Sequence, residues 1–121
     1  MGRWQIIQRD PLIICDTGHN VGGWEYLSKQ LDQTPCHALH IVIGMVNDKD
    51  IHGVLKLLPK KAIYYFTNAS VERALPAEEF ALQASEHGLK GTIHSSVALA
   101  IDAAKNAAEP NDCIFIGGST F

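Results

Sequence analysis

The sequence lacks the short motifs that are typical of self-contained nucleotide-dependent or metal-dependent enzymes. It contains no G-x-x-x-x-G-K-[ST] phosphate-binding loop, no G-x-G-x-x-G fingerprint, no His-Glu-x-x-His motif and no Cys-x-x-Cys pair. A nucleotidase, dehydrogenase or zinc enzyme complete within this chain is therefore not indicated. No segment approaches the roughly 18 apolar residues of a membrane span, and Met1-Gly2-Arg3-Trp4 lacks the apolar core of a secretory signal. We expect no membrane segment and a cytoplasmic location.

Basic charge is also scarce. The 121 residues carry 13 acidic and 10 basic side chains, which gives a formal net charge of -3. Because nucleic-acid binding relies on a basic surface that neutralises phosphates, nucleic acid is not an expected partner. The three cysteines, Cys15, Cys36 and Cys113, lie far apart, and two of them stand inside apolar runs. Buried free thiols in a reducing cytoplasm are the expectation.

The residues that are present indicate one globular domain over residues 1–121, because 46% are hydrophobic and 19% charged. Short β-branched runs alternate with segments of helical period, a pattern that predicts an α/β fold. We expect a Rossmann-like three-layer sandwich with a mainly parallel sheet of about six strands. The expected strands are 4–8, 12–15, 39–43, 63–67, 92–94 and 113–116, and the expected helices are 22–31, 51–58, 77–87 and 97–108.

Local chemistry refines this expectation. The connection over residues 9–11 is too short for a parallel crossover, so the first strand should be an antiparallel edge strand. Asp50 and Ser96 are expected to cap the helices that follow them. Pro76, which is followed by Glu78 and Glu79, suits a first helical turn, and Gly88 suits the position just after a helix.

Polar residues follow four of the expected strands. Ligands of open parallel sheets collect outside the carboxyl ends of the strands, so these positions are the first candidates for a site. The four clusters are Asp16-Thr17-Gly18-His19-Asn20, the run from Gly44 to Asp50, the run from Thr67 to Pro76, and Gly117-Gly118-Ser119-Thr120.

Each cluster has a chemical interpretation and a plain one. A carboxylate such as Asp16 can bond two ribose hydroxyls, His19 beside a helix start can meet an anion, and Arg73 can hold a carboxylate bidentately. The plain alternatives are an Asx turn, a helix cap, solvated loop residues and a simple turn. Spacing alone favours the plain interpretation for the first three clusters and leaves the fourth open.

The histidines do not indicate a metal site. His37 and His40 are three residues apart, and on a strand they would point to opposite faces, which is wrong for joint ligation. We therefore expect no metal ligands in this chain. His52, His87 and His94 are expected at or near the surface.

Taken in order, the clusters resemble the C-terminal glutamate-ligase domain of the Mur ligase superfamily, and most closely its folylpolyglutamate synthase/dihydrofolate synthase branch. Gly18 and Val21 stand where the family usually has Ala and Pro. The matching segments are Gly2-Arg3-Trp4 for Pro-Gly-Arg-(aromatic), Asp16 to Asn20 for Asp-x-Ala-His-Asn-Pro, Gly44 to Asp50 for Gly-x-x-x-Asp-Lys-Asp, Glu72 to Pro76 for Pro-Arg-(Ser/Ala), and Gly117-Gly118-Ser119 for the closing Gly-Ser.

The resemblance implies half of an ATP-dependent ligase. In that family ATP and Mg²⁺ serve to phosphorylate the terminal carboxylate of a folate or dihydropteroate, and the amino group of glutamate then attacks the acyl phosphate. An N-terminal P-loop domain of the same polypeptide holds most of the Mg²⁺ ligands. The chain is therefore expected to be a fragment of a longer two-domain enzyme and to be inactive alone, an expectation that the abrupt end after Phe121 also favours.

The resemblance also assigns residues. Arg3 and Asp16 would bind the nucleotide, and His19 would act catalytically near the phosphates or the incoming glutamate. The expected substrate-binding residues are Arg73, Ser119 and Asn20, and the expected supporting residues are Asp48 and Lys49. Two alternatives remain open, a peptidoglycan-precursor Mur ligase and a non-enzymatic α/β nucleotide-sensing module. The Gly44 to Asp50 run favours the folate branch over the peptidoglycan enzymes.

Overall fold

The computed structural model describes residues 5–9, 11–16, 21–46, 51–69 and 74–118. Strands and helices alternate along them after an initial pair of strands. In chain order the elements are β1 (Gln5–Gln8), β2 (Leu12–Cys15), α1 (Val21–Gln33), β3 (Leu39–Gly44), α2 (Ile51–Leu57), β4 (Ile63–Phe66), α3 (Ala77–Glu86), β5 (Lys90–Ile93), α4 (Val97–Ala107) and β6 (Cys113–Gly118).

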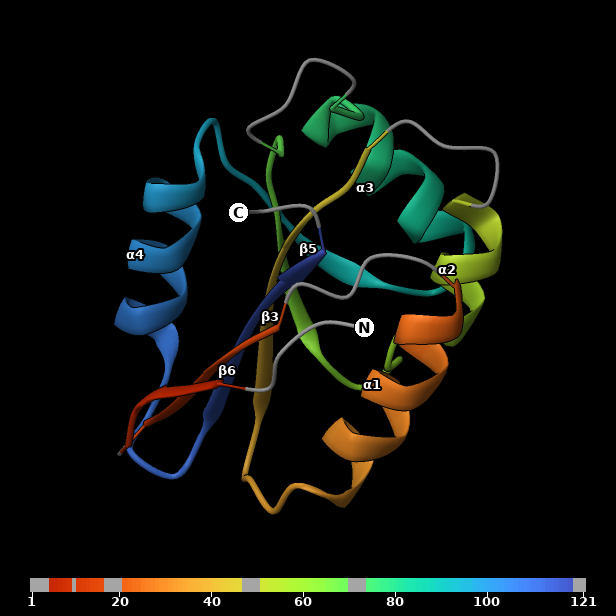
Figure 1. Cartoon of the computed structure of the whole chain (residues 1–121). Coiled ribbons are helices and arrows are strands. Elements are labelled where there is room, and N and C mark those ends of the chain that lie inside the picture. The colour runs from red at the N-terminus through yellow and green to blue at the C-terminus, as the bar shows by residue number, and fades with distance from the viewer. Residues whose placement is uncertain (1–4, 10, 17–20, 47–50, 70–73, 119–121) are drawn as a thin grey trace.

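The strands form one sheet in the order β1-β2-β6-β3-β4-β5 (Figure 1). Every neighbouring pair is parallel except β1 and β2, which are antiparallel, so the prediction of an antiparallel N-terminal edge strand is confirmed. The last strand in the sequence, β6, lies between β2 and β3. β2 and β6, which are far apart in the sequence, are therefore neighbours inside the sheet.

Helices cover both faces of the sheet. In Figure 1, α4 lies on one side of the sheet, whereas α1, α2 and α3 lie on the other. The larger core contains Trp24, Phe66 and Phe115, and the Trp24 and Phe115 rings meet edge to face with centroids 5.8 Å apart. The smaller core packs Ala100 and Ala104 of α4 onto the opposite face. These layers confirm the predicted three-layer sandwich.

Two helix ends follow the predicted chemistry, whereas α1 ends at Gln33, two residues beyond the predicted end. The Ser96 hydroxyl accepts a hydrogen bond from the Leu99 N–H at 3.1 Å, which is an N-cap of α4. Gly88 follows α3 with φ of 79°, a left-handed conformation that glycine adopts without strain. The Asn68 side chain accepts from the Ala77 N–H at 2.6 Å and so satisfies a free donor at the start of α3. Asp50, the other predicted cap, lies outside the described residues.

Two strand boundaries differ from the prediction by two residues. β5 begins at Lys90 rather than 92, because Lys90 and Gly91 pair with Ile63 and Tyr64 at an edge where apolar residues are not required. β6 continues through Gly117 and Gly118, which were expected to follow the last strand. Both pairings depend on a neighbouring strand and not on the local composition. None of the helices in the described part of the chain combines the length and apolarity needed to cross a bilayer.

Candidate functional site

The carboxyl ends of the four central strands lie at one edge of the sheet. Cys15 of β2 pairs with Ile116 of β6, and Gly118 of β6 pairs with Gly44 of β3. On the next strand, Phe66 of β4 pairs with Ile43 of β3. Because all four strands are parallel, the residues that follow them converge at this edge, which we call the ligand edge.

Asp16 lies at the ligand edge directly after β2. Its N–H donates to the Ile116 carbonyl at 3.1 Å, so the ladder between β2 and β6 continues for one residue beyond the strand. The residue is only 3% exposed. Asp16 is therefore a buried residue at the position where open parallel sheets bind ligands.

Gly44 closes β3 against the segment that follows β4. A Cβ atom at this position would lie 2.9 Å from both the Ala69 nitrogen and the Thr67 carbonyl oxygen. The Thr67 N–H donates to the Ile43 carbonyl at 3.0 Å, which holds the two segments side by side. Glycine is therefore required for the close approach of two backbones at the ligand edge.

The segments that follow β3 and β4 stay paired beyond the sheet. The Leu75 N–H donates to the Met45 carbonyl at 2.8 Å, and Val46 and Ala74 form an isolated antiparallel bridge. This pairing brings the start of the second predicted cluster beside the end of the third.

Thr67 begins the third predicted cluster, but the sequence interpretation gave it no role. Its side chain is fully buried, and its hydroxyl has no hydrogen-bond partner among the described residues. A buried hydroxyl without a partner is uncommon and is often explained by a ligand, a water or a nearby group. The signal in the sequence was a polar residue directly after an apolar strand, the same signal that selected Asp16.

Most of the predicted site residues lie outside the described part of the chain. These are Arg3, His19, Asn20, Asp48, Lys49, Arg73 and Ser119. The structure does bring together residues that flank their segments, because these neighbours all lie at the ligand edge: Asp16, Val46, Ala74 and Gly118. Asp16 is thus the predicted site residue whose own placement is described.

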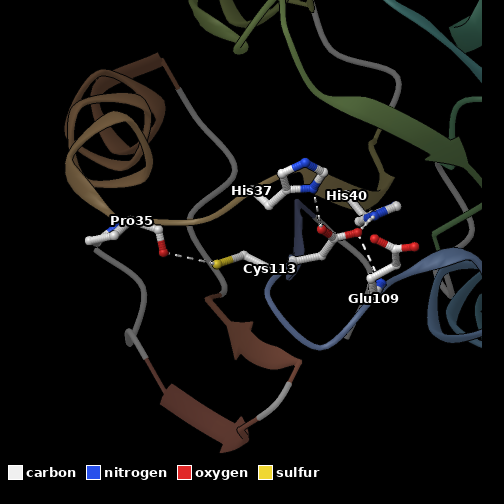
Figure 2. Close-up of polar contacts among 6 residues, drawn as sticks. Pro35, His37, His40, Glu109 and Cys113 are labelled. Atoms are coloured by element: carbon white, nitrogen blue, oxygen red, sulfur yellow. Dashed lines mark hydrogen bonds and ion pairs between the residues drawn. The ribbon is translucent and has the colours of Figure 1, made fainter.

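A second polar cluster lies at the opposite edge, where β3 and β6 begin (Figure 2). Asp112, which is 4% exposed, accepts a hydrogen bond from the Glu109 N–H at 3.0 Å on its Oδ2. The same oxygen lies 2.8 Å from Nε2 of buried His40, whose Nδ1 lies 2.8 Å from the Tyr65 hydroxyl. Asp112 Oδ1 lies 3.3 Å from Nδ1 of His37.

These contacts determine the charges in the cluster. Burial alone would raise the pKa of the Asp112 carboxyl, but the Glu109 N–H and the two histidines outweigh it and hold that pKa below its usual range. An ionised Asp112 requires His40 to donate from Nε2, and in the tautomer that carries its proton on Nε2 the Nδ1 atom accepts from the Tyr65 hydroxyl. Burial and the Asp112 charge raise the pKa of Tyr65, which keeps that hydroxyl protonated as a donor.

The sequence argument about His37 and His40 was wrong in its geometry. His37 lies before β3 rather than on it, so the alternation of a strand does not apply, and both rings contact the same carboxylate. Both ring nitrogens of His40 are engaged within the protein. As predicted, His52 is exposed, and His87 and His94 are half-buried.

Comparisons with known proteins agree with this arrangement. The family model described as "Mur ligase, glutamate ligase domain" matches residues 2–120. The chain is 37% identical over 119 residues to the dihydrofolate synthase/folylpolyglutamate synthase of Escherichia coli. The alignment covers 98% of this chain and 28% of that protein. The structure of the Escherichia coli enzyme in complex with DHPP and ADP superposes with a TM-score of 0.85 at 35% identity, covering 98% of this chain and 28% of that one.

A second solved structure adds further ligands. A bifunctional folylpolyglutamate synthase/dihydrofolate synthase with Mn, AMPPNP and L-glutamate bound superposes with a TM-score of 0.85 at 31% identity, covering 98% of this chain and 29% of that one. The chain thus spans less than a third of the length of these relatives. The end-to-end match confirms the resemblance seen in the sequence: the chain belongs to the Mur ligase family of glutamate ligase domains.

Proposed function

We propose that residues 1–121 form the C-terminal domain of a two-domain enzyme that uses ATP to join glutamate to a folate or a dihydropteroate. The observation that carries the proposal is the match over 98% of the chain to relatives of that name, one of them solved with DHPP and ADP. Another was solved with Mn, AMPPNP and L-glutamate, which correspond to the divalent metal, the ATP and the glutamate of such a reaction. An N-terminal P-loop domain of the same polypeptide completes the site, and the enzyme works in the cytoplasm.

The ligand edge suits the sugar of a nucleotide. Asp16 supplies a carboxylate that can accept hydrogen bonds from two ribose hydroxyls, and the buried Thr67 hydroxyl lies at the same edge. Gly44 leaves no side chain between the segments that follow β3 and β4. Asp16 is the one carboxylate among the described residues of this edge. The family resemblance assigns most of the Mg²⁺ ligands to the P-loop domain.

The proposed roles of the remaining residues follow from charge. When bound, Mg²⁺ neutralises the phosphates during transfer. Arg3 would bind the nucleotide with Asp16, and His19 would stand beside the reacting phosphate. Arg73, Asn20 and Ser119 would bind glutamate, with Asp48 and Lys49 at the mouth of the cleft. Closure of the two domains would exclude water and bring these groups to the developing negative charge.

The test uses the longer polypeptide that contains this domain. Asp16→Asn removes the charge while conserving shape, so we expect the KM for ATP to rise about tenfold or more, because a hydrogen bond to a charged group contributes roughly 1.5–3 kcal/mol. Glutamate-dependent ADP release, with dihydropteroate or tetrahydrofolate as acceptor, is the measurement. Asp32→Asn, at an exposed position of α1, is the matched control.

The same assay tests the rest of the proposal. Unchanged ATP kinetics in Asp16→Asn would remove Asp16 from the nucleotide site. Ligation by residues 1–121 alone would contradict the two-domain arrangement. Use of a nucleotide-linked muramyl peptide in place of both pterin acceptors would assign the enzyme to peptidoglycan synthesis instead. The relative rates with the two pterin acceptors define the substrate preference.

A further inference from the structure

We infer that His37, Glu109 and Asp112 form a binding site for a divalent transition-metal ion of the Zn²⁺ type, separate from the ligand edge. Each residue offers one ligand atom, and the three atoms lie within 4.8 Å of one another. One imidazole nitrogen with two carboxylates is a donor set that Zn²⁺ accepts, with a fourth position left for water. In the described part of the chain no other group of three His, Cys, Asp or Glu residues comes this close.

The spacing of two of these atoms is compatible with a shared metal ion as well as with the long hydrogen bond between them. His37 Nδ1 and Asp112 Oδ1 lie 3.3 Å apart. Charge-assisted hydrogen bonds between nitrogen and carboxylate are shorter, about 2.7–2.9 Å. Two ligand atoms bound to tetrahedral Zn²⁺ at roughly 2.0–2.1 Å are separated by about 3.3 Å, which follows from the tetrahedral angle.

His40 and Glu109 fix the orientation of the Asp112 carboxylate, as neighbouring residues do for ligands in metal sites. His40 Nε2 and the Glu109 N–H both bind Oδ2, so Oδ1 faces His37. His40 is itself held by the Tyr65 hydroxyl. Such hydrogen-bonded supports are what orient metal ligands in known sites. Figure 2 shows His37, His40 and Glu109 placed around this one carboxylate.

Access to the site comes from solvent. The His37 side chain is 73% exposed and Glu109 is exposed, so an ion can reach both groups and either can adjust its rotamer. Asp112 supplies the fixed member. A bound ion would strengthen the link between the segment before β3 and the segment between α4 and β6, which are already joined by a hydrogen bond from the His37 N–H to the Asn111 carbonyl at 2.9 Å.

The site is distant from the proposed chemistry. His37 and Asp112 precede β3 and β6, whereas the ligand edge follows them, and six strand residues span about 20 Å at roughly 3.3 Å each. Zinc binding here therefore does not depend on the proposed function, and its test needs no activity.

The experiment titrates ZnCl₂ into the metal-free 121-residue chain at pH 7.5 by isothermal calorimetry, with thermal unfolding measured in parallel. We expect one ion per chain and a rise in the unfolding midpoint of several degrees at saturation. Glu109→Gln removes a ligand but keeps the backbone N–H, and His37→Ala removes an exposed ring. Each should weaken binding at least about tenfold, since even supporting residues of metal sites contribute that much.

A matched control is available in a pair of neighbouring histidines, His52 and His87. His52 Nδ1 and His87 Nε2 also lie 3.3 Å apart, without a third ligand among the described residues. His87→Ala should leave the Zn²⁺ affinity unchanged. The inference is overturned if the wild-type chain binds no Zn²⁺, if His87→Ala abolishes binding, or if Glu109→Gln and His37→Ala bind as the wild type does. Circular dichroism of Glu109→Gln confirms that the fold is retained.

Discussion

At the scale of single residues, the chain Tyr65, His40 and Asp112 is a buried polar network with long-range partners. His40 and Asp112 are 72 positions apart, and His40 and Tyr65 are 25 apart. The donors and acceptors between these three side chains are matched, so loss of any one leaves a buried group without a partner. No local pattern indicated this network, because its members come from β3, β4 and the segment before β6.

Tyr65→Phe tests this network. The substitution keeps the ring and removes the hydroxyl that donates to His40 Nδ1, so we expect the free energy of unfolding to fall by about 1–3 kcal/mol. Denaturation in urea measures the change. Tyr26→Phe, at a position that is 53% exposed, is the control and should stay within about 0.5 kcal/mol of the wild type. Equal stability of the two variants would show that the Tyr65 hydroxyl is not part of the network.

At the scale of elements, two helix ends were predicted from their residues, whereas the end of α1 and two strand ends were each missed by two residues. Ser96 and Gly88 were predicted as terminal residues, and both serve as such, because a cap depends on side-chain chemistry within one turn. Gly117 and Gly118 were expected to follow the last strand, and they are part of β6. Two consecutive glycines give no local signal for a strand. Their pairing with Ile43 and Gly44 is what makes them part of β6.

Ser96→Ala tests the cap of α4. The substitution removes the oxygen that accepts from the Leu99 N–H, and caps of this type contribute about 1 kcal/mol. We expect a loss of that size in the free energy of unfolding, measured by urea denaturation. Ser95→Ala is the adjacent control, since Ser95 is exposed and its hydroxyl bonds to none of the described residues. A Ser96→Ala variant as stable as Ser95→Ala would mean that the α4 terminus is satisfied by water.

At the scale of the whole molecule, one sheet separates two cores. Trp24 belongs to the core under α1, α2 and α3, and Cys15 belongs to the core under α4. Both cores share β2, β3, β4 and β6, because alternate residues of each strand face opposite sides. The two cores should therefore unfold together.

Two probes test this cooperativity. In a Trp4→Phe background, Trp24 fluorescence reports on the larger core during urea denaturation. Burial raises the pKa of the Cys15 thiol and shields it, so its alkylation by iodoacetamide reports on opening of the smaller core. We expect both transitions at the same urea concentration. Alkylation of Cys15 at distinctly lower urea would show that α4 leaves the sheet separately.

Much of this protein could be foreseen from its residues alone. The alternation of apolar runs with segments of helical period indicated the α/β class, and five short motifs in order indicated the family. Both are local features that can be recognised in the sequence itself. The motifs also selected Asp16, which the structure places at the ligand edge. The roles of Arg3, His19, Asn20, Asp48, Lys49, Arg73 and Ser119 stay predictions.

Other features were decided by the tertiary structure. The order of the strands places β6 between β2 and β3, and that order alone brings Asp112 to His37 and His40. It likewise makes Gly44 indispensable beside Thr67 and Ala69. The physical reason is the same in both cases: contacts between residues distant in sequence depend on which strands pair, and strand pairing is a property of the folded sheet rather than of any segment within it.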